Sequence, residues 1–468
     1  MKRGLWWILG ILLSPVLLFV VLVLLLYLPP VQNWLVDKVA AYASEQTGME
    51  ITVGQVRMSF PLGLSVEDVK VIHQPDTIAD VERVVVDVQL LPLFGGKVVI
   101  NQLEINNTSL NTNGFVDAAQ VKGKFGRLFV KSDGIDLNEE TIEVNGARLE
   151  DAQLDIALTD SVPEDTTTSE TRWKIHVDEA KIKRSDIILH MPGDTMSIRT
   201  HVGTLTAQEA LIDLEQQTYT VASLDWVNGA LQYDQNYQPR IEGFDYNHID
   251  LSNINIGIDS IYYHDPTLRL HMRTVALREK SGLQVTDLTG PLTMENGAIR
   301  LPKFHLKTPE SDIDVELDMP LSLTDSINPG QMQLRLRAQV GKQDLMKFLS
   351  TMPQGFREQW PHEPLMMTGQ MKGNMQYMEF SDLDVTLPSA FQATATGFVA
   401  NLDRPQQLRA DVQFQAKTQN MNFVTAMLSR DMQRNYRLPS GMTAAGRVKV
   451  DGANYIADVT AHEGKGTV

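Results

Sequence analysis

Two-residue alternation of apolar and polar side chains is the feature that most limits how this chain can fold. In the stretch SDIDVELDM, Ile313, Val315, Leu317 and Met319 alternate with acidic residues. Successive side chains of a β-strand point to opposite faces of its sheet. The pattern therefore predicts a strand with one apolar face and one solvated face.

The same alternation recurs in many runs after residue 48, and turn sequences such as NNTSLNTNG and ENGA separate these runs. Further positions that we expect on an apolar face are Met332, Leu334, Leu336, Val412 and Phe414. Strands and helices do not alternate regularly, which disfavours a parallel α/β fold. We therefore expect a mainly β chain with a curved antiparallel sheet and a few short amphipathic helices.

The N-terminus carries the longest apolar run. Lys2 and Arg3 precede an uncharged stretch from Gly4 to Leu28, which is long enough to cross a bilayer core of about 30 Å as a helix. A cleaved signal peptide is the alternative, but its apolar segment spans only about 7–15 residues and ends in a small-residue cleavage site. We expect an uncleaved single-pass anchor with the N-terminus in the cytoplasm and the bulk of the chain on the far side of the membrane; in a Gram-negative cell these are the inner (plasma) membrane and the periplasm. The anchor residues singled out are Leu5, Trp6, Trp7, Leu12, Leu18, Val23, Tyr27 and Leu28.

Changes in pattern and composition divide the chain into segments. We expect a cytoplasmic tip and transmembrane anchor at 1–28, a short amphipathic helix at 29–48, an N-terminal β unit at 49–158, an acidic mobile loop at 159–171, a β-groove at 172–340, a helix-plus-strands repeat at 341–416 and a second, truncated repeat at 417–468. The acidic loop lacks apolar anchors, and the helices are recognised by apolar residues at helical spacing.

The predicted repeat rests on two helical segments that match at an offset of about 75 residues. Met346 corresponds to Met421, and Phe348 corresponds to Phe423. Asp344 is expected to cap the first of these helices. The second copy stops at Val468 without an atypical closing unit, so we expect the chain to be the front part of a longer protein.

Composition and motifs argue against several classes of function. The net charge of -17 disfavours a nucleic-acid partner, and the absence of cysteine excludes disulfides and thiolate chemistry. The sequence contains no zinc-protease, serine-hydrolase or nucleotide-binding motif, and its ten histidines show no metal-ligand spacing. The acidic residues of SDIDVELD are interpreted as a solvated strand face rather than a calcium site. We therefore expect no catalytic residue, no cofactor, no metal site and no enzyme activity.

Two stretches resemble the AsmA-like family of inner-membrane-anchored periplasmic proteins, and within it the TamB (translocation and assembly module) branch. The first is EQTGMEITVGQVRMSF, in which Thr47-Gly48 precedes a strand with Ile51-x-Val53-Gly54. The second is VERVVVDVQLLPLFGGKVVINQLEINNTSL, in which LFGG at 93–96 separates two strands. The helix-plus-strands repeat is a weaker third point of similarity. The first two stretches fall within roughly the first 110 residues.

This resemblance implies an elongated, taco-like β-groove with an apolar interior that reaches from the inner membrane into the periplasm. It also implies movement of phospholipid between the inner and outer membranes. TamB-like members are further linked to outer-membrane biogenesis and protein secretion, with an Omp85-type outer-membrane barrel as partner.

Independently of the resemblance, one curved sheet with few helices leaves an apolar face uncovered, and such a face marks a binding surface. The residues expected to contact lipid are Ile313, Val315, Leu317, Met319, Met332, Leu334, Leu336, Val412 and Phe414. The alternative is an assembly factor that binds no lipid and pairs its strand edges with client β-proteins. An anchored enzyme with a β-sandwich core is a third hypothesis, and it would require a buried polar cluster.

Overall fold

The computed structural model describes residues 38–467, apart from residues 39, 42–43, 46–47, 60–62, 74, 90–98, 113–118, 137–138, 160–171, 326, 436–439 and 464–465. The predicted anchor at 1–28, the LFGG motif and nearly all of the predicted acidic loop lie outside the described residues. Within the predicted helix at 29–48, the described residues Lys38, Ala40, Ala41, Ser44 and Glu45 are helical. In the part of the chain that the structure describes, no helix has both the length and the apolar character needed to cross a membrane.

The chain divides into two compact units, Met1–Gln217 and Thr218–Val468. The described strands of the first unit are β1 (Glu50–Thr52), β2 (Gln55–Ser59), β3 (Gly63–His73), β4 (Asp76–Val88), β5 (Ile100–Asn111), β6 (Ala119–Asp136), β7 (Thr141–Glu150), β8 (Gln153–Leu158), β9 (Lys174–His190) and β10 (Met196–Asp213), with a short 3-10 turn, η1 (Pro192–Asp194), before β10. Strands β3 to β6 pair in chain order and antiparallel, β1 and β2 both pair with β3, and β9 pairs antiparallel with β10.

The first unit also contains two parallel pairings, which the expectation of a purely antiparallel sheet did not include. Strands β7 and β8 both pair antiparallel with β6. Both then pair parallel with β9. A parallel neighbour requires a connection long enough to return the chain to the same end of the sheet. In the sequence, 15 residues separate Leu158, the end of β8, from Lys174, the start of β9.

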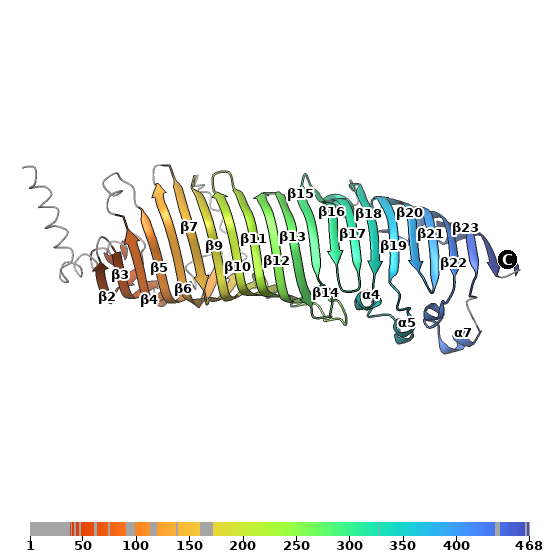
Figure 1. The fold of residues 1–468 in the computed structure, drawn as a ribbon, viewed down its shortest axis with the longest axis horizontal. Coiled ribbons are helices and arrows are strands. Elements are labelled where there is room, and N and C mark those ends of the chain that lie inside the picture. Colours follow the sequence, from red (N-terminus) through yellow and green to blue (C-terminus); the bar gives the residue numbers. More distant parts are fainter. Residues whose placement is uncertain are drawn as a thin grey trace, which may run out of the picture. The chain divides into compact units, whose positions relative to one another are not determined.

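The second unit is antiparallel throughout its described pairings. Its strands are β11 (Thr218–Gln235), β12 (His248–His264), β13 (Thr267–Glu279), β14 (Gln284–Val285), β15 (Asp287–Glu295), β16 (Ala298–Lys307), β17 (Asp312–Pro320), β18 (Met332–Val340), β19 (Leu365–Gly373), β20 (Tyr377–Leu387), β21 (Phe391–Ala400), β22 (Arg409–Thr418), β23 (Thr443–Asp451), β24 (Asn454–Glu463) and β25 (Gly466–Thr467). Apart from the short β14, each strand pairs with the next one along the chain (Figure 1). The prediction of a mainly β, largely antiparallel fold is confirmed.

Short helices interrupt the second unit at two places. They are α4 (Lys342–Phe348) and α5 (Gln354–Gln359) between β18 and β19, and α6 (Asn422–Thr425) and α7 (Arg430–Asn435) between β22 and β23; η2 (Leu321–Thr324) and η3 (Pro405–Gln407) are single 3-10 turns. Figure 1 shows both helix pairs at the same end of the strands. The prediction that Asp344 caps the first helix is wrong, because Gly341 is the N-cap and Asp344 lies buried inside the first turn.

Mid-strand β-bulges keep apolar side chains on one face where the sequence alternation breaks. In β16, Leu301 lies opposite Leu317 and Phe304 lies opposite Val315, with a register shift between them. A bulge adds one residue to a strand and so switches which face the following residues occupy. Leu301 and Phe304 therefore share a face although they are three positions apart in the sequence.

Candidate apolar binding face

Seven of the nine residues predicted to contact lipid lie on the neighbouring strands β17 and β18. In register, Val315 lies opposite Leu336, and Leu317 lies opposite Leu334. Residues directly opposite each other in an antiparallel pair project to the same face. Alternation along each strand places the others on that face: Ile313 and Met319 in β17, and Met332 in β18.

Val412 and Phe414 lie in β22, four strands along from β18, and cross-strand neighbours join them to the others. Leu334 lies opposite Met371, which in turn lies opposite Phe380. Phe380 lies opposite Gly397, and Gly397 lies opposite Val412. These directly opposite residues form a row from β18 to β22, and the row lies on the same face of the sheet as the apolar side chains of β17 and β18. We call the surface that carries these residues the apolar face of the second unit.

All nine candidate residues are half-buried: none is fully buried and none is exposed. Where helices pack over this face, they bury the central side chains completely, as at Leu387 and Ala390, although Met367 and Val385 at the margin of that cover stay half-buried. Open solvent on both sides would leave the apolar side chains exposed. Half-burial is the result expected where neighbouring side chains on the same face shield each other but no protein layer covers them.

Among the residues that the structure describes, helices cover the apolar face only at one end of the strands. The covered end consists of Leu365 in β19, Leu387 in β20 and Ala390 in the turn that follows, which pack against Phe356, Trp360 and Phe423 from α5, its C-terminal boundary and α6. Leu387 and Ala390 are 0% exposed. The ring of Trp360 lies 5.4 Å from that of Phe356 and 4.8 Å from that of Phe423, measured between centroids. Of the eleven buried apolar residues that the structure describes in this unit, six therefore lie here.

A buried carboxylate holds α4 against the sheet. Thr308 Oγ1 and Ser311 Oγ, from the β16–β17 turn, donate hydrogen bonds of 2.5 and 2.7 Å to Asp344 Oδ2. Lys347 Nζ donates to Asp344 Oδ1 at 3.1 Å. Burial alone would raise the pKa of Asp344, but these hydrogen bonds and the charge of Lys347 outweigh it and hold the pKa below its ordinary value.

The opposite face of the same strands is charged. Arg335 Nη1 lies 2.5 Å from Glu316 Oε2, and Arg300 Nε lies 3.1 Å from Asp318 Oδ2. Farther along the sheet, the Arg447 guanidinium beside Asp411 holds the pKa of that carboxyl below its ordinary value. Cross-strand ion pairs of this kind keep one face of the sheet hydrated while the other face stays apolar.

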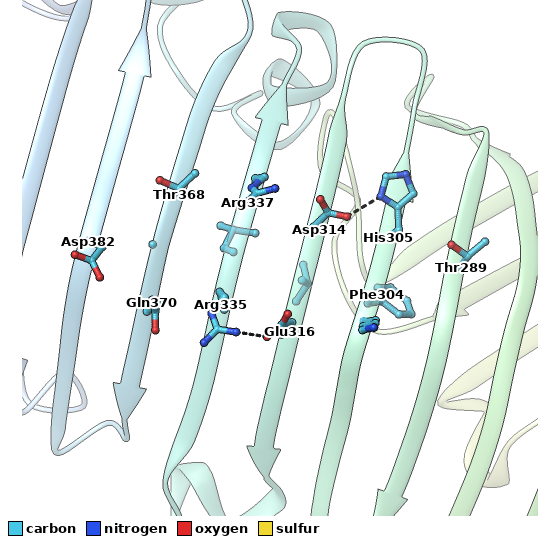
Figure 2. Close-up of a pocket in the computed structure, with 14 residues that line it drawn as sticks. Thr289, Phe304, His305, Asp314, Glu316, Arg335, Arg337, Thr368, Gln370 and Asp382 are labelled. Atoms are coloured by element: carbon cyan, nitrogen blue, oxygen red, sulfur yellow. Dashed lines mark hydrogen bonds and ion pairs between the residues drawn. The ribbon is translucent and has the colours of Figure 1, made fainter.

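Two hollows of about 610 and 660 Å³ lie against this charged face, not against the apolar face. Figure 2 shows the first hollow, with Arg335 turned toward Glu316 and His305 turned toward Asp314. Val315 and Leu336 also border this hollow, but their side chains project from the opposite face of the sheet. Each of them lies between two residues whose side chains face the hollow, and neighbouring residues of a strand point to opposite faces. The predicted lipid-contact residues therefore do not gather in these hollows.

Sequence reasoning missed one cluster on the charged face. His305 in β16 lies opposite Asp314 in β17, and Asp312 lies beside them. Among the described residues, these three form the one group of histidine and acidic side chains placed closely enough to hold a metal ion. Histidine spacing within one strand could not reveal it, because a turn separates His305 from the two acids. Alignment of the two strands as a β-hairpin across that turn would have placed His305 beside the two acids.

Neither a scan of the sequence against protein-family models nor a comparison with curated proteins finds a match for this chain.

Proposed function

We propose that this chain is an inner-membrane-anchored periplasmic protein of the AsmA-like family, TamB branch, and that it conducts phospholipid along the apolar face. In this proposal the face is the inner wall of a β-groove, and the acyl chains lie along rows of aliphatic side chains. In this proposal its partner is an Omp85-type barrel in the outer membrane. Conduction of this kind requires no catalytic residue, no cofactor and no nucleotide.

The observation that carries the proposal is the continuity of half-buried apolar side chains from strand to strand. The rows extend from Leu301 in β16 to Val448 in β23, and in the described part of the chain helices cover only one end of the strands. Contiguous apolar surface that protein does not cover is typical of a binding site for an apolar partner. A small, shaped ligand would need a pocket with convergent polar groups, whereas a hydrocarbon chain needs only an unbroken apolar surface.

The free energy of acyl transfer is large enough to make such a surface useful. Two acyl chains carry roughly 30 methylene groups, and each methylene gains about 0.8 kcal/mol on leaving water, so exposure of both chains costs about 24 kcal/mol. The apolar face lowers this cost at every position along the sheet. The charged face, with its cross-strand ion pairs, keeps the other side of the sheet in water.

Photocrosslinking in Gram-negative cells tests the proposal. A photoreactive amino acid is introduced at Val315 or Leu334, and the cross-linked products of the full chain are analysed by mass spectrometry. Phospholipid adducts are expected from both positions. The matched controls are Glu316 and Arg335, which follow these residues in the sequence but project from the charged face, so they are expected to give no lipid adduct.

Two results would overturn the proposal. Equal lipid capture from both faces would mean that the whole sheet lies near lipid without a preferred surface. Capture of protein alone from Val315 and Leu334 would mean that another polypeptide covers the apolar face, and β-rich clients among the captured proteins would favour the strand-pairing alternative.

A further inference from the structure

The charged face carries one histidine that meets two carboxylates at a single ring nitrogen. His305 Nδ1 lies 2.9 Å from Asp314 Oδ1 and 3.7 Å from Asp312 Oδ1. One donor atom from each residue can be chosen so that all three lie within 4.8 Å of one another. Asp312 and Asp314 lie two positions apart in β17 and so share a face, and the register of β16 brings His305 opposite Asp314. The backbone pairing itself therefore assembles this cluster.

Cations lie directly across from both acids, yet the acids turn toward the imidazole. In register, Lys307 lies opposite Asp312 and Arg337 lies opposite Asp314. In the part of the chain that the structure describes, both carboxylates form their ion pairs with His305 rather than with those cations. The two carboxylates thus converge on one point beside Nδ1, where a single imidazole faces two negative charges.

Other histidines of the chain form histidine–carboxylate pairs of the usual kind. His201 Nδ1 contacts one carboxylate, that of Asp186, at 2.7 Å. His248 contacts two, but Asp245 lies at Nδ1 and Asp234 at Nε2, on different sides of the ring. Only convergence of the donors on one point creates a chelating geometry, and His305 differs from both in this respect.

The spacing of the donors matches that around a tetrahedral metal ion. Zinc lies about 2.0–2.2 Å from imidazole nitrogen and carboxylate oxygen, which places two such ligands roughly 3.4 Å apart. The two distances from Nδ1, 2.9 and 3.7 Å, lie on either side of that value. The third separation, between the two carboxylates, is at most 4.8 Å for the donor atoms that fit best.

We propose that His305, Asp312 and Asp314 bind a divalent cation of the zinc class, which joins β16 to β17 on the charged face. Imidazole suits zinc, copper and nickel, whereas calcium and magnesium take oxygen ligands and prefer more of them. The fourth position is left to water. His305 and Asp314 also line the hollow of about 610 Å³, so that position is open to solvent (Figure 2).

This site is independent of the proposed lipid path. Ile313 lies between the two acidic ligands in β17 and projects from the opposite face. Metal binding can therefore fail while lipid capture succeeds, and the reverse, so each experiment addresses one proposal.

Zinc titration of the purified full chain, prepared without a histidine tag, tests the inference. Calorimetry is expected to show a binding event that is lost, or weakened by at least about 10–100-fold, in His305→Ala and in Asp314→Asn, because even an outer-shell substitution costs that much. Asp314→Asn keeps the size of the side chain and guards against a loss of binding caused by misfolding. His201→Ala removes a histidine with a single acid partner and is expected to leave this event unchanged.

Cobalt serves as a spectroscopic probe of the same site, because its visible absorption reports the number and geometry of its ligands. A tetrahedral spectrum that disappears in His305→Ala, with unchanged far-UV circular dichroism, supports the assignment. Zinc affinity that is the same in the original chain, His305→Ala and Asp314→Asn would overturn it. So would displacement of zinc by equimolar calcium.

Discussion

The covered end and the open stretch of the apolar face follow the same sequence alternation but differ in burial. In β20, Leu387 at the covered end is completely buried, whereas Phe380, toward the other end of the same strand and on the same face, is only half-buried. The covered end gains its burial from α5 and α6, which place aromatic rings over the strand ends. Alternation, together with the bulge in β20, therefore determines which face is apolar, and the helices determine how much of that face protein buries.

The largest expected effect concerns the aromatic cover. Trp360→Ala removes a side chain that is 8% exposed and packs against two aromatic rings, so we expect a loss of about 3–5 kcal/mol in the free energy of unfolding. Urea unfolding followed by circular dichroism measures it. Tyr455→Ala, at a position that is 73% exposed, is the control, with an expected change below about 0.5 kcal/mol. Similar losses in the two variants would show that the helices do not cover the sheet as described.

A second pair of variants compares the two regions directly with the same chemical change. Leu387→Ala is expected to cost about 2–5 kcal/mol, because it leaves a cavity in a fully buried cluster. Leu334→Ala removes a half-buried side chain, and we expect it to cost about 0.8–1.5 kcal/mol, which is half of the transfer free energy of a fully buried side chain, without a cavity. Urea midpoints measure both, and equal costs would mean that the open stretch is in fact packed.

A third prediction concerns the carboxylate that positions α4. Asp344→Asn is expected to cost about 1–3 kcal/mol at neutral pH, because it weakens charge-assisted hydrogen bonds from Thr308, Ser311 and Lys347. The pKa of Asp344 is lower in the folded than in the unfolded chain, so the folded state binds fewer protons. Its contribution is present above the unfolded pKa, near pH 4, and is lost as the pH falls through the folded pKa.

Denaturation at a series of pH values measures this contribution. The stability difference between the original chain and Asp344→Asn is expected to shrink as the pH falls below about 4. A difference that stays constant across that range would contradict a lowered pKa for Asp344.

The smallest expected effect lies on the charged face. Arg335→Ala breaks the ion pair with Glu316, but both side chains are about half exposed to solvent, so we expect a change of less than about 1 kcal/mol. The change is expected to shrink further at high salt, because ions screen exposed charges. A larger, salt-independent loss would show that the charged face is buried against something, contrary to the proposed division of the sheet into an apolar face and a hydrated face.

Sequence reasoning was accurate where the side-chain period of a strand is regular. The expected strand at SDIDVELDM is β17, with its apolar residues on one face and Asp312, Asp314 and Glu316 exposed on the other. A strand period of two residues needs no knowledge of the neighbouring strands, because local backbone geometry alone sets it.

Sequence reasoning was less accurate where the environment depends on distant segments. The offset of about 75 residues pairs Phe348 with Phe423, yet Phe348 is 56% exposed and Phe423 is 4% exposed. Phe348 packs against Phe244 from the β11–β12 connection, at a ring distance of 5.0 Å, whereas Phe423 lies among the rings of α5. The predicted repeat stays a prediction, although the order strand, helix, helix, strand occurs twice, from β18 to β19 and from β22 to β23.

Other features depended on pairing between strands. Bulges in β16 and β20 return Leu301 and Phe304, and likewise Phe380 and Leu383, to a single face, and no local pattern predicts this. The parallel pairing of β7 and β8 with β9 and the meeting of His305 with Asp312 and Asp314 likewise follow from register.

By itself the sequence determined that this chain is mainly β, that its strands are two-faced, and which side chains share a face wherever the alternation is unbroken, because these properties follow from backbone geometry repeated every two residues. Only the tertiary structure decided which part of the apolar face the helices cover and which donors converge at His305. Those outcomes depend on contacts between residues far apart in the chain, and neither composition nor periodicity encodes such contacts.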